Sequence, residues 1–116
     1  MANPCRGEIW LADLGAGEGH EQSGTRPVLV LSVDAFNAGP AGLVTTVPIT
    51  AKIAKSRNIP SHILIGPPEG GLKTASVILC DQTRTLSKTR LRARWGVITA
   101  TTMGLVENAV RGLLGL

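Results

Sequence analysis

Short apolar runs, each bounded by glycine, proline or polar residues, fill most of the chain and predict a fold built from short strands. The run Val28-Leu29-Val30-Leu31 is apolar at every position, which is typical of a strand buried on both faces. Runs of this kind with turn residues at both ends favour strands. The segments expected to be strands are Gly7–Leu14, Pro27–Ser32, Leu43–Thr50, Ser61–Ile65, Thr74–Leu86 and Leu91–Ile98.

Two of these segments carry a residue that strands usually exclude. Pro48 lies within Leu43–Thr50, and because proline has no backbone N–H it implies a sheet edge, a strand end or a bulge. Thr74–Leu86 is the longest candidate, and it turns from apolar to polar at Asp81. Aspartate is disfavoured in strands, so Asp81 either serves a site or interface or accepts hydrogen bonds from nearby backbone amides.

The C-terminal segment has a different spacing, which predicts a helix. Thr99 suits the N-cap position, and Gly115 suits the residue that ends the helix. A single helical turn is also expected over Val33–Asn37. We expect the apolar stripe of the long helix to pack on the sheet. Its members are Met103, Val106, Val110 and Leu113.

Short strands followed by a terminal helix predict a mainly β fold of the α+β class, a strongly bent antiparallel sheet or small barrel with a helix packed against it. The length of 116 residues suits one domain, 1–116, that can bury a core, and 43% of residues are apolar. No signal-peptide-like stretch and no run of membrane-spanning length is present, so a cytoplasmic protein is expected.

The positive net charge of the chain favours an anionic partner. The chain has 12 Lys and Arg against 8 Asp and Glu, and its net charge is +4. The basic stripe Lys88, Arg90, Arg92 and Arg94 is either a solvated strand edge or a surface that attracts RNA. Aromatic residues make up 3% of the chain, so phosphate contacts and base-edge hydrogen bonds would carry more of any RNA binding than stacking.

Several kinds of site are not indicated by the sequence. No P-loop, no GxGxxG after a strand and no HExxH is present, and the acidic residues are scattered singly. A two-metal nuclease needs clustered carboxylates, so no metal or cofactor is expected and a metal-free route is favoured. Cys5 and Cys80 form no CxxC pair, and Cys80 is expected to be a buried, inert thiol.

The strongest local candidate is the end of the glycine-rich loop Gly15–Thr25, which carries His20 and Glu21 and runs into a buried strand at Arg26. A guanidinium fork suits a phosphate and its more negative transition state, although a salt bridge to Glu21 explains Arg26 equally well.

A second candidate is Thr50, which ends a strand before the basic loop Ala51–Pro60 with its Lys52, Lys55 and Arg57. A threonine there is usually only a cap or turn residue. His62 is interpreted as structural or surface, because nothing near it in sequence indicates a role.

Three ordered groups of residues strongly resemble the motifs of MazF/PemK-type toxins, and the similarity covers nearly the whole chain. The first motif is the most specific, and the combination is more specific still. The first motif comprises Arg6-Gly7-Glu8-Ile9-Trp10-Leu11, Gly19-His20-Glu21-Gln22 and Gly24-Thr25-Arg26-Pro27-Val28-Leu29-Val30-Leu31. The second is Val47-Pro48-Ile49-Thr50, and the third is Cys80-Asp81-Gln82-Thr83-Arg84-Thr85.

The resemblance implies a small barrel-like sheet with a C-terminal helix, a homodimer, and a sequence-selective endoribonuclease that is the toxin of a type II toxin–antitoxin pair. The implied partners are single-stranded RNA and a MazE-like antitoxin whose acidic tail occupies the RNA groove. Arg26 and Thr50 match the core catalytic pair, and His20 and Asp81 match catalytic positions of the PemK branch. The implied substrate contacts are Glu21, Gln22, Gln82 and Arg84.

One position departs from the PemK pattern, because Leu79 stands where that branch has an arginine two residues before the aspartate. We therefore expect a reaction centred on Arg26 and Thr50, in which the RNA 2′-hydroxyl attacks the adjacent phosphorus. His20 is the leading candidate for the base, ahead of Glu21 and Asp81, because histidine ionises near neutral pH. Two alternatives share the fold: a CcdB-like gyrase poison that is not a nuclease, and an RNA-binding module that has lost catalysis.

Overall fold

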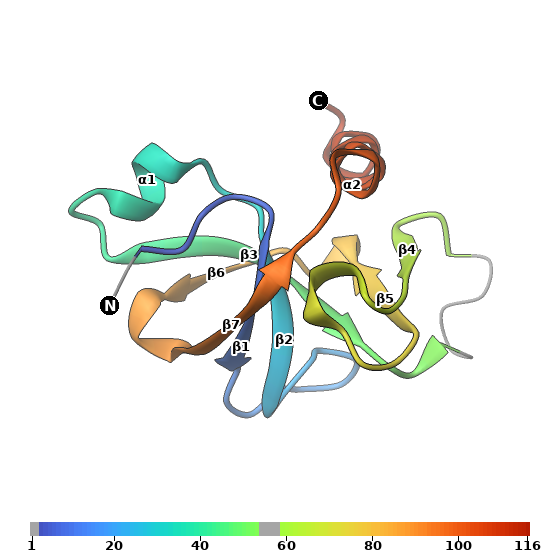
Figure 1. Ribbon diagram of the computed structural model, residues 1–116, viewed down its shortest axis with the longest axis horizontal. Helices are drawn as coiled ribbons and strands as arrows, with labels where there is room; N and C mark the ends of the chain where they lie inside the picture. Colours follow the sequence, from blue (N-terminus) through green and yellow to red (C-terminus); the bar gives the residue numbers. More distant parts are fainter. Residues whose placement is uncertain (1–2, 54–58) are drawn as a thin grey trace.

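A computed structural model describes residues 3–53 and 59–116, and its strands form one bent antiparallel sheet of seven strands (Figure 1). The main path through the sheet is β4-β5-β3-β2-β1-β7, and β6 pairs with β3 beside that path. The strands are β1 (Glu8–Asp13), β2 (Thr25–Val30), β3 (Leu43–Thr50), β4 (His62–Ile65), β5 (Ser76–Leu79), β6 (Arg84–Ser87) and β7 (Leu91–Val97).

The predicted bent sheet with a C-terminal helix is confirmed, and the path ends at β4 and β7 without closing into a barrel. Helix α2 (Ala100–Leu114) begins after Thr99, whose Oγ1 accepts a hydrogen bond from Thr102 N at 3.2 Å. It ends at Gly115, which has a φ of 72°. The single turn α1 (Asp34–Ala38) lies between β2 and β3, as expected.

Strand β3 organises the sheet because it pairs with three neighbours. One side pairs with β2, from Val28↔Pro48 to Val30↔Thr46. The other side pairs first with β6, up to Thr46↔Arg84, and then with β5, from Ile49↔Ile78. Pro48 therefore lies in the interior of a central strand, where pairing with β6 has ended and pairing with β5 has not begun. Proline has no backbone N–H, and this is tolerated where β3 changes its partner from β6 to β5. The sequence implied a sheet edge, a strand end or a bulge at Pro48, and the structure has this change of partner instead.

The segment Thr74–Leu86 is not one long strand, so that expectation was wrong. It divides into β5, a 3₁₀ turn η3 (Cys80–Gln82) and β6. Thr83 Oγ1 closes the turn by donating to the carbonyl of Cys80 at 3.0 Å. The physical reason is the bend of the sheet. Strand β5 pairs with the C-terminal end of β3 and β6 pairs with its N-terminal half, so the chain turns between the two. The polar residues after Cys80 form the connection, and aspartate is disfavoured in regular strands.

Two apolar cores lie on opposite faces of the sheet, as the alternation of side chains along β1 and β2 requires. The first lies between the sheet and α2, and includes Ile9, Leu29, Val47, Ile49, Ile78, Met103 and Val106. The second is enclosed where β6 and β7 fold over the other face, and includes Trp10, Ala12, Leu14, Val28, Val30, Val44, Leu86 and Leu91.

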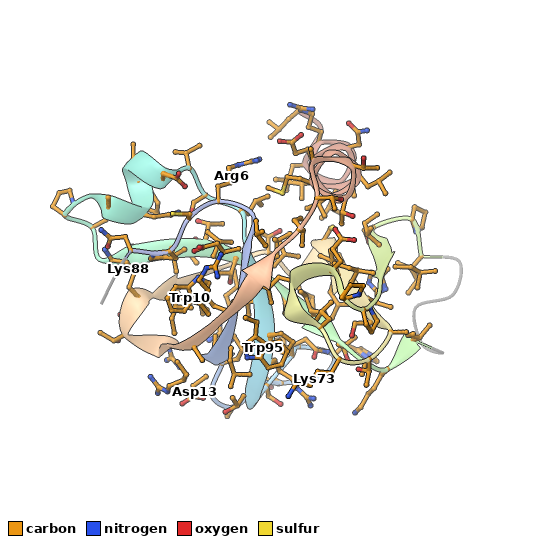
Figure 2. All side chains as sticks on the ribbon, viewed as in Figure 1. Arg6, Trp10, Asp13, Lys73, Lys88 and Trp95 are labelled. Carbon is orange, nitrogen blue, oxygen red and sulfur yellow. The ribbon has the colours of Figure 1, made fainter. Side chains whose placement is uncertain are left out.

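The C-terminal helix packs on the sheet through its first three turns and leaves its last turn in solvent. Met103 and Val106 are buried and Val110 packs against the first core, but Leu113 is 50% exposed, so the expectation for Leu113 was wrong. An ion pair between Arg6 and Glu107, at 2.8 Å, ties the N-terminal segment to the helix, and Figure 2 shows Arg6 pointing towards α2. None of the described helices is long and apolar enough to cross a membrane.

Candidate functional site

A pocket of about 580 Å³ opens beside the second core. Three parts of the fold line it: the loop between β1 and β2, the middle of β3, and the η3 turn with the start of β6. Several of its lining residues come from separate motifs of the sequence. The lining residues are Leu14, His20, Glu21, Gln22, Thr46, Pro48, Asp81, Gln82, Thr83 and Arg84.

Side chains from the third motif fasten the loop of the first motif. Gln82 Nε2 donates to the carbonyl of His20 at 3.0 Å, and Gln82 Oε1 accepts from Gln22 N at 2.9 Å. Arg84 Nη1 donates to the carbonyl of Leu14 at 3.0 Å, where the loop begins. Both side chains were expected to contact a substrate, and here they hold the loop that forms one wall of the pocket.

Arg26 and Thr50 lie on neighbouring strands beside this pocket, although neither is among its lining residues. The β2–β3 register pairs Val28 with Pro48, and continuing it by two residues places Arg26 opposite Thr50. Alternation along a strand puts both on the face that carries Val28 and Pro48. Pro48 lines the pocket, so Arg26 and Thr50 belong to the same face of the sheet as this lining residue, two positions further along their strands.

The hydrogen bonds of Arg26 and Thr50 are local. Arg26 is half-buried, and its Nε donates to the carbonyl of Ser23 at 3.2 Å. No ion pair links it to Glu21 within the described ranges, so the salt bridge that explained Arg26 equally well is not formed here. Thr50 is 6% exposed, and its Oγ1 accepts from Lys52 N at 3.2 Å, which is a turn contact. Lys55 and Arg57, the other cations noted in that loop, lie outside the described residues.

Sequence reasoning missed the partner of Asp81. His62 Nε2 lies 3.0 Å from Asp81 Oδ1 and 3.1 Å from Oδ2, and the His62 side chain is only 9% exposed. The expected backbone amides are therefore replaced by an imidazole. The register His62↔Leu79 between β4 and β5 brings the two residues together, and no sequence pattern reveals that register.

Comparison with known proteins adds to this geometry. A family model described as "PemK-like, MazF-like toxin of type II toxin-antitoxin system" matches residues 5–114. The chain belongs to this PemK-like, MazF-like toxin family. Its similarity to the family spans the pocket and both strands that carry Arg26 and Thr50.

Solved structures of family members have the same fold. A MazF crystal structure from Deinococcus radiodurans is 28% identical, with a TM-score of 0.84, and the match covers 100% of both chains. A mycobacterial endoribonuclease, solved in complex with its cognate antitoxin, is 30% identical, with a TM-score of 0.76, over 100% of this chain and 97% of that one. A MazE–MazF structure from Deinococcus radiodurans is 28% identical, with a TM-score of 0.79, over 100% of this chain and 99% of that one.

Leu79, at which the sequence departs from the PemK pattern, lies in the core of the protein. Leu79 is 3% exposed at the end of β5. A buried leucine supplies no cation to the pocket, so Asp81 has His62 as its partner and no arginine at position 79.

Side chains of the basic stripe, Lys88 to Arg94, make hydrogen bonds and ion pairs with other parts of the fold. Lys88 Nζ donates to the carbonyl of Asn37 at 2.7 Å, and Arg90 Nη1 donates to the carbonyl of Asp13 at 3.1 Å. Arg94 pairs with Glu8 at 2.5 Å. Burial alone would raise the pKa of Glu8, but hydrogen bonds from the Cys5 amide, Arg94 and Trp10 hold it below its ordinary value. The stripe therefore fastens the 3₁₀ turn η4 (Lys88–Arg90) to α1 and β1, and β7 to β1. Its attraction for RNA stays a prediction.

Two further expectations concern cysteines and metals. Cys80 is fully buried and both cysteines are free thiols. The expected burial of Cys80 is confirmed. Burial raises the pKa of the Cys80 thiol to about 11, and the nearby Asp81 charge adds to the rise, which favours an inert thiol. In the part of the chain that the structure describes, no three His, Cys, Asp or Glu side chains are grouped as a metal site.

Proposed function

We propose that this protein is the toxin of a type II toxin–antitoxin pair, and that it cuts single-stranded RNA at selected sequences without a metal ion. The observation that carries the proposal is the pocket, because it gathers side chains of the first and third motifs beside Arg26 and Thr50. Membership of the toxin family, and the mycobacterial neighbour named as an endoribonuclease, support this interpretation.

The proposed reaction is an internal transesterification of RNA. The 2′-oxygen forms a bond to the adjacent phosphorus, and the bond from phosphorus to the 5′-oxygen breaks. One product then ends in a 2′,3′-cyclic phosphate and the other begins with a 5′-hydroxyl. The reaction needs a base for the 2′ proton, an acid for the 5′-oxygen, and stabilisation of the more negative phosphorane.

Arg26 has the chemistry for the last of these tasks. A guanidinium is cationic and offers several donors in one plane, which suits the equatorial oxygens of a phosphorane. Thr50, opposite it on β3, would hold one phosphate oxygen through its hydroxyl. Arg26 would also be placed to protonate the departing 5′-oxygen.

Two pocket residues are the main candidates for the base. His20 is exposed on the loop, with its backbone fixed by Gln82, so its imidazole is accessible to a bound nucleotide. Asp81 faces the same pocket from the η3 turn and is fixed by His62. Glu21 accepts from Glu18 N at 3.2 Å within the loop and is the weaker third candidate. We keep His20 as the leading candidate because histidine changes protonation near neutral pH.

The proposed partners follow from the family. The mycobacterial and Deinococcus neighbours were solved with antitoxins, so a MazE-like antitoxin is the proposed inhibitor of this chain. A homodimer is proposed as the working state. Val97, Leu105 and Leu114 are 49–59% exposed, and apolar side chains left in solvent favour such a contact.

The test of the proposed function is incubation of the purified protein with a long RNA in excess EDTA, followed by mapping of every new end. We expect discrete cuts at a short recurring sequence, cyclic phosphate or 3′-phosphate ends upstream, and 5′-hydroxyl ends downstream. Binding without cuts would favour the RNA-binding module. Intact RNA together with loss of gyrase supercoiling would favour the gyrase poison, and cuts that disappear in EDTA would contradict the metal-free route.

A further inference from the structure

His62 lies outside the family motifs, and the reaction described above gives it no step of its own. His62 begins β4 and reaches across the hairpin to the η3 turn, where both carboxylate oxygens of Asp81 lie within hydrogen-bond distance of Nε2. We infer that His62 is a positioning residue, which holds the carboxylate of Asp81 at the pocket so that its remaining lone pairs face the bound RNA. This inference rests on the proposed function.

The imidazole of His62 is buried, and its hydrogen bonding explains better than its shape why a histidine stands at this position. Because a carboxylate accepts, Nε2 must carry the hydrogen, and neutral His62 then has Nδ1 as an acceptor. Nδ1 is buried and has no hydrogen-bond partner among the described residues. An apolar side chain of similar shape would leave no such unpaired atom. The contact with Asp81 is therefore the feature that distinguishes histidine from leucine here.

Asp81 is held on one side and open on the other. Its side chain is 35% exposed and lines the pocket, while His62 behind it is 9% exposed. A carboxylate with one fixed neighbour loses the freedom to rotate away from a substrate. Such preorganisation matters because small displacements of a reacting group are costly in rate.

The turn that carries Asp81 has supports besides His62. Cys80 N donates to the carbonyl of Ser61 at 3.0 Å, and the β4–β5 pairing continues from His62↔Leu79 to Ile65↔Ser76. Gln82, the next residue, fastens the loop on the other side. Substitution of His62 should therefore release the carboxylate while the backbone of the turn stays in place.

A double-mutant cycle tests the inference through single-turnover cleavage by the full chain. We expect His62→Leu and Asp81→Asn each to slow cleavage by roughly ten- to a hundredfold, and the double variant to be no slower than Asp81→Asn. His62→Gln, which can return an N–H near the same place, should recover much of the loss. The inference is overturned if His62→Leu slows the Asp81→Asn variant as much as it slows the wild type, or if it has no effect on the wild type at all.

A second measurement separates this inference from the proposed function. The chain has two histidines, so nitrogen NMR of the wild type and a His20→Ala variant assigns the ring of His62. We expect the tautomer with hydrogen on Nε2 in the wild type and a mixture in Asp81→Asn. A ring protonated on Nδ1 alone would contradict the pairing. A wild type that cleaves no RNA would contradict the proposed function instead, and the spectrum would still decide the pairing.

Discussion

Arg26→Ala is expected to lower RNA cleavage by about a thousandfold or more while leaving the protein folded. The guanidinium is the group proposed to stabilise the phosphorane, and its neighbour Thr50 carries no charge with which to replace it. Among the residues that the structure describes, Arg26 loses its Nε hydrogen bond to the carbonyl of Ser23, which corresponds to about 1 kcal/mol in the free energy of unfolding. Single-turnover cleavage at saturating protein measures the first quantity, and urea denaturation the second.

The control for Arg26 is Arg111→Ala, which removes the same charge from the exposed last turn of α2. Loss of general attraction for RNA would appear equally in both variants, whereas loss of transition-state stabilisation would appear in Arg26→Ala alone. If folded Arg26→Ala cleaves at the wild-type rate, the assignment of Arg26 as the catalytic centre is wrong.

Gly71→Ala is expected to lower the free energy of unfolding by about 3 kcal/mol or more. Gly71 lies in the turn η2 (Glu69–Gly71), with a φ of 74° that L side chains rarely adopt. A Cβ at this position would lie 2.3 Å from the carbonyl oxygen of Trp95, which belongs to the backbone of β7 and cannot rotate away. Both the strained dihedral and the clash oppose the folded state, and urea denaturation with a shared m-value measures their sum.

Gly112→Ala provides the matched control, because it makes the same substitution where a Cβ meets nothing within 4 Å. Gly112 lies inside α2, so alanine should stabilise the protein by about 0.5–1 kcal/mol through its better helix propensity. A loss below about 1 kcal/mol in Gly71→Ala would show that η2 moves away from β7 easily, which contradicts the close packing of Gly71 on Trp95.

The sequence predicted those elements whose signals are local. Leu43–Thr50 was predicted with the bounds that the structure has, because a β-rich run between turn residues defines a strand without help from its neighbours. Thr99 and Gly115 likewise marked both ends of α2 through capping chemistry. The exposed Leu113 shows what helical spacing cannot predict. The spacing identifies the apolar face of α2, but it does not show how far along the helix the sheet extends beneath that face.

Features that depend on strand register could not be predicted. The break at η3 follows from the switch of β3 between β6 and β5. Pro48 and the change from apolar to polar residues at Asp81 mark this place in the sequence, but neither reveals which strands pair there. The contact between His62 and Asp81 depends on the register between β4 and β5, so the sequence alone indicated no role for His62. The motifs did predict that residues far apart in the chain serve one site, and the pocket joins His20 and Glu21 with Asp81 and Gln82.

The most direct test of the central claim uses two synthetic RNAs that contain the mapped cleavage sequence and differ in one atom. The first has ribose throughout, and the second has a single 2′-deoxy sugar on the 5′ side of the scissile phosphate. In EDTA, the wild-type protein should cut the first RNA to a cyclic phosphate and bind the second without cutting it at that position. Cleavage of the 2′-deoxy RNA at the same phosphate would contradict attack by the 2′-hydroxyl.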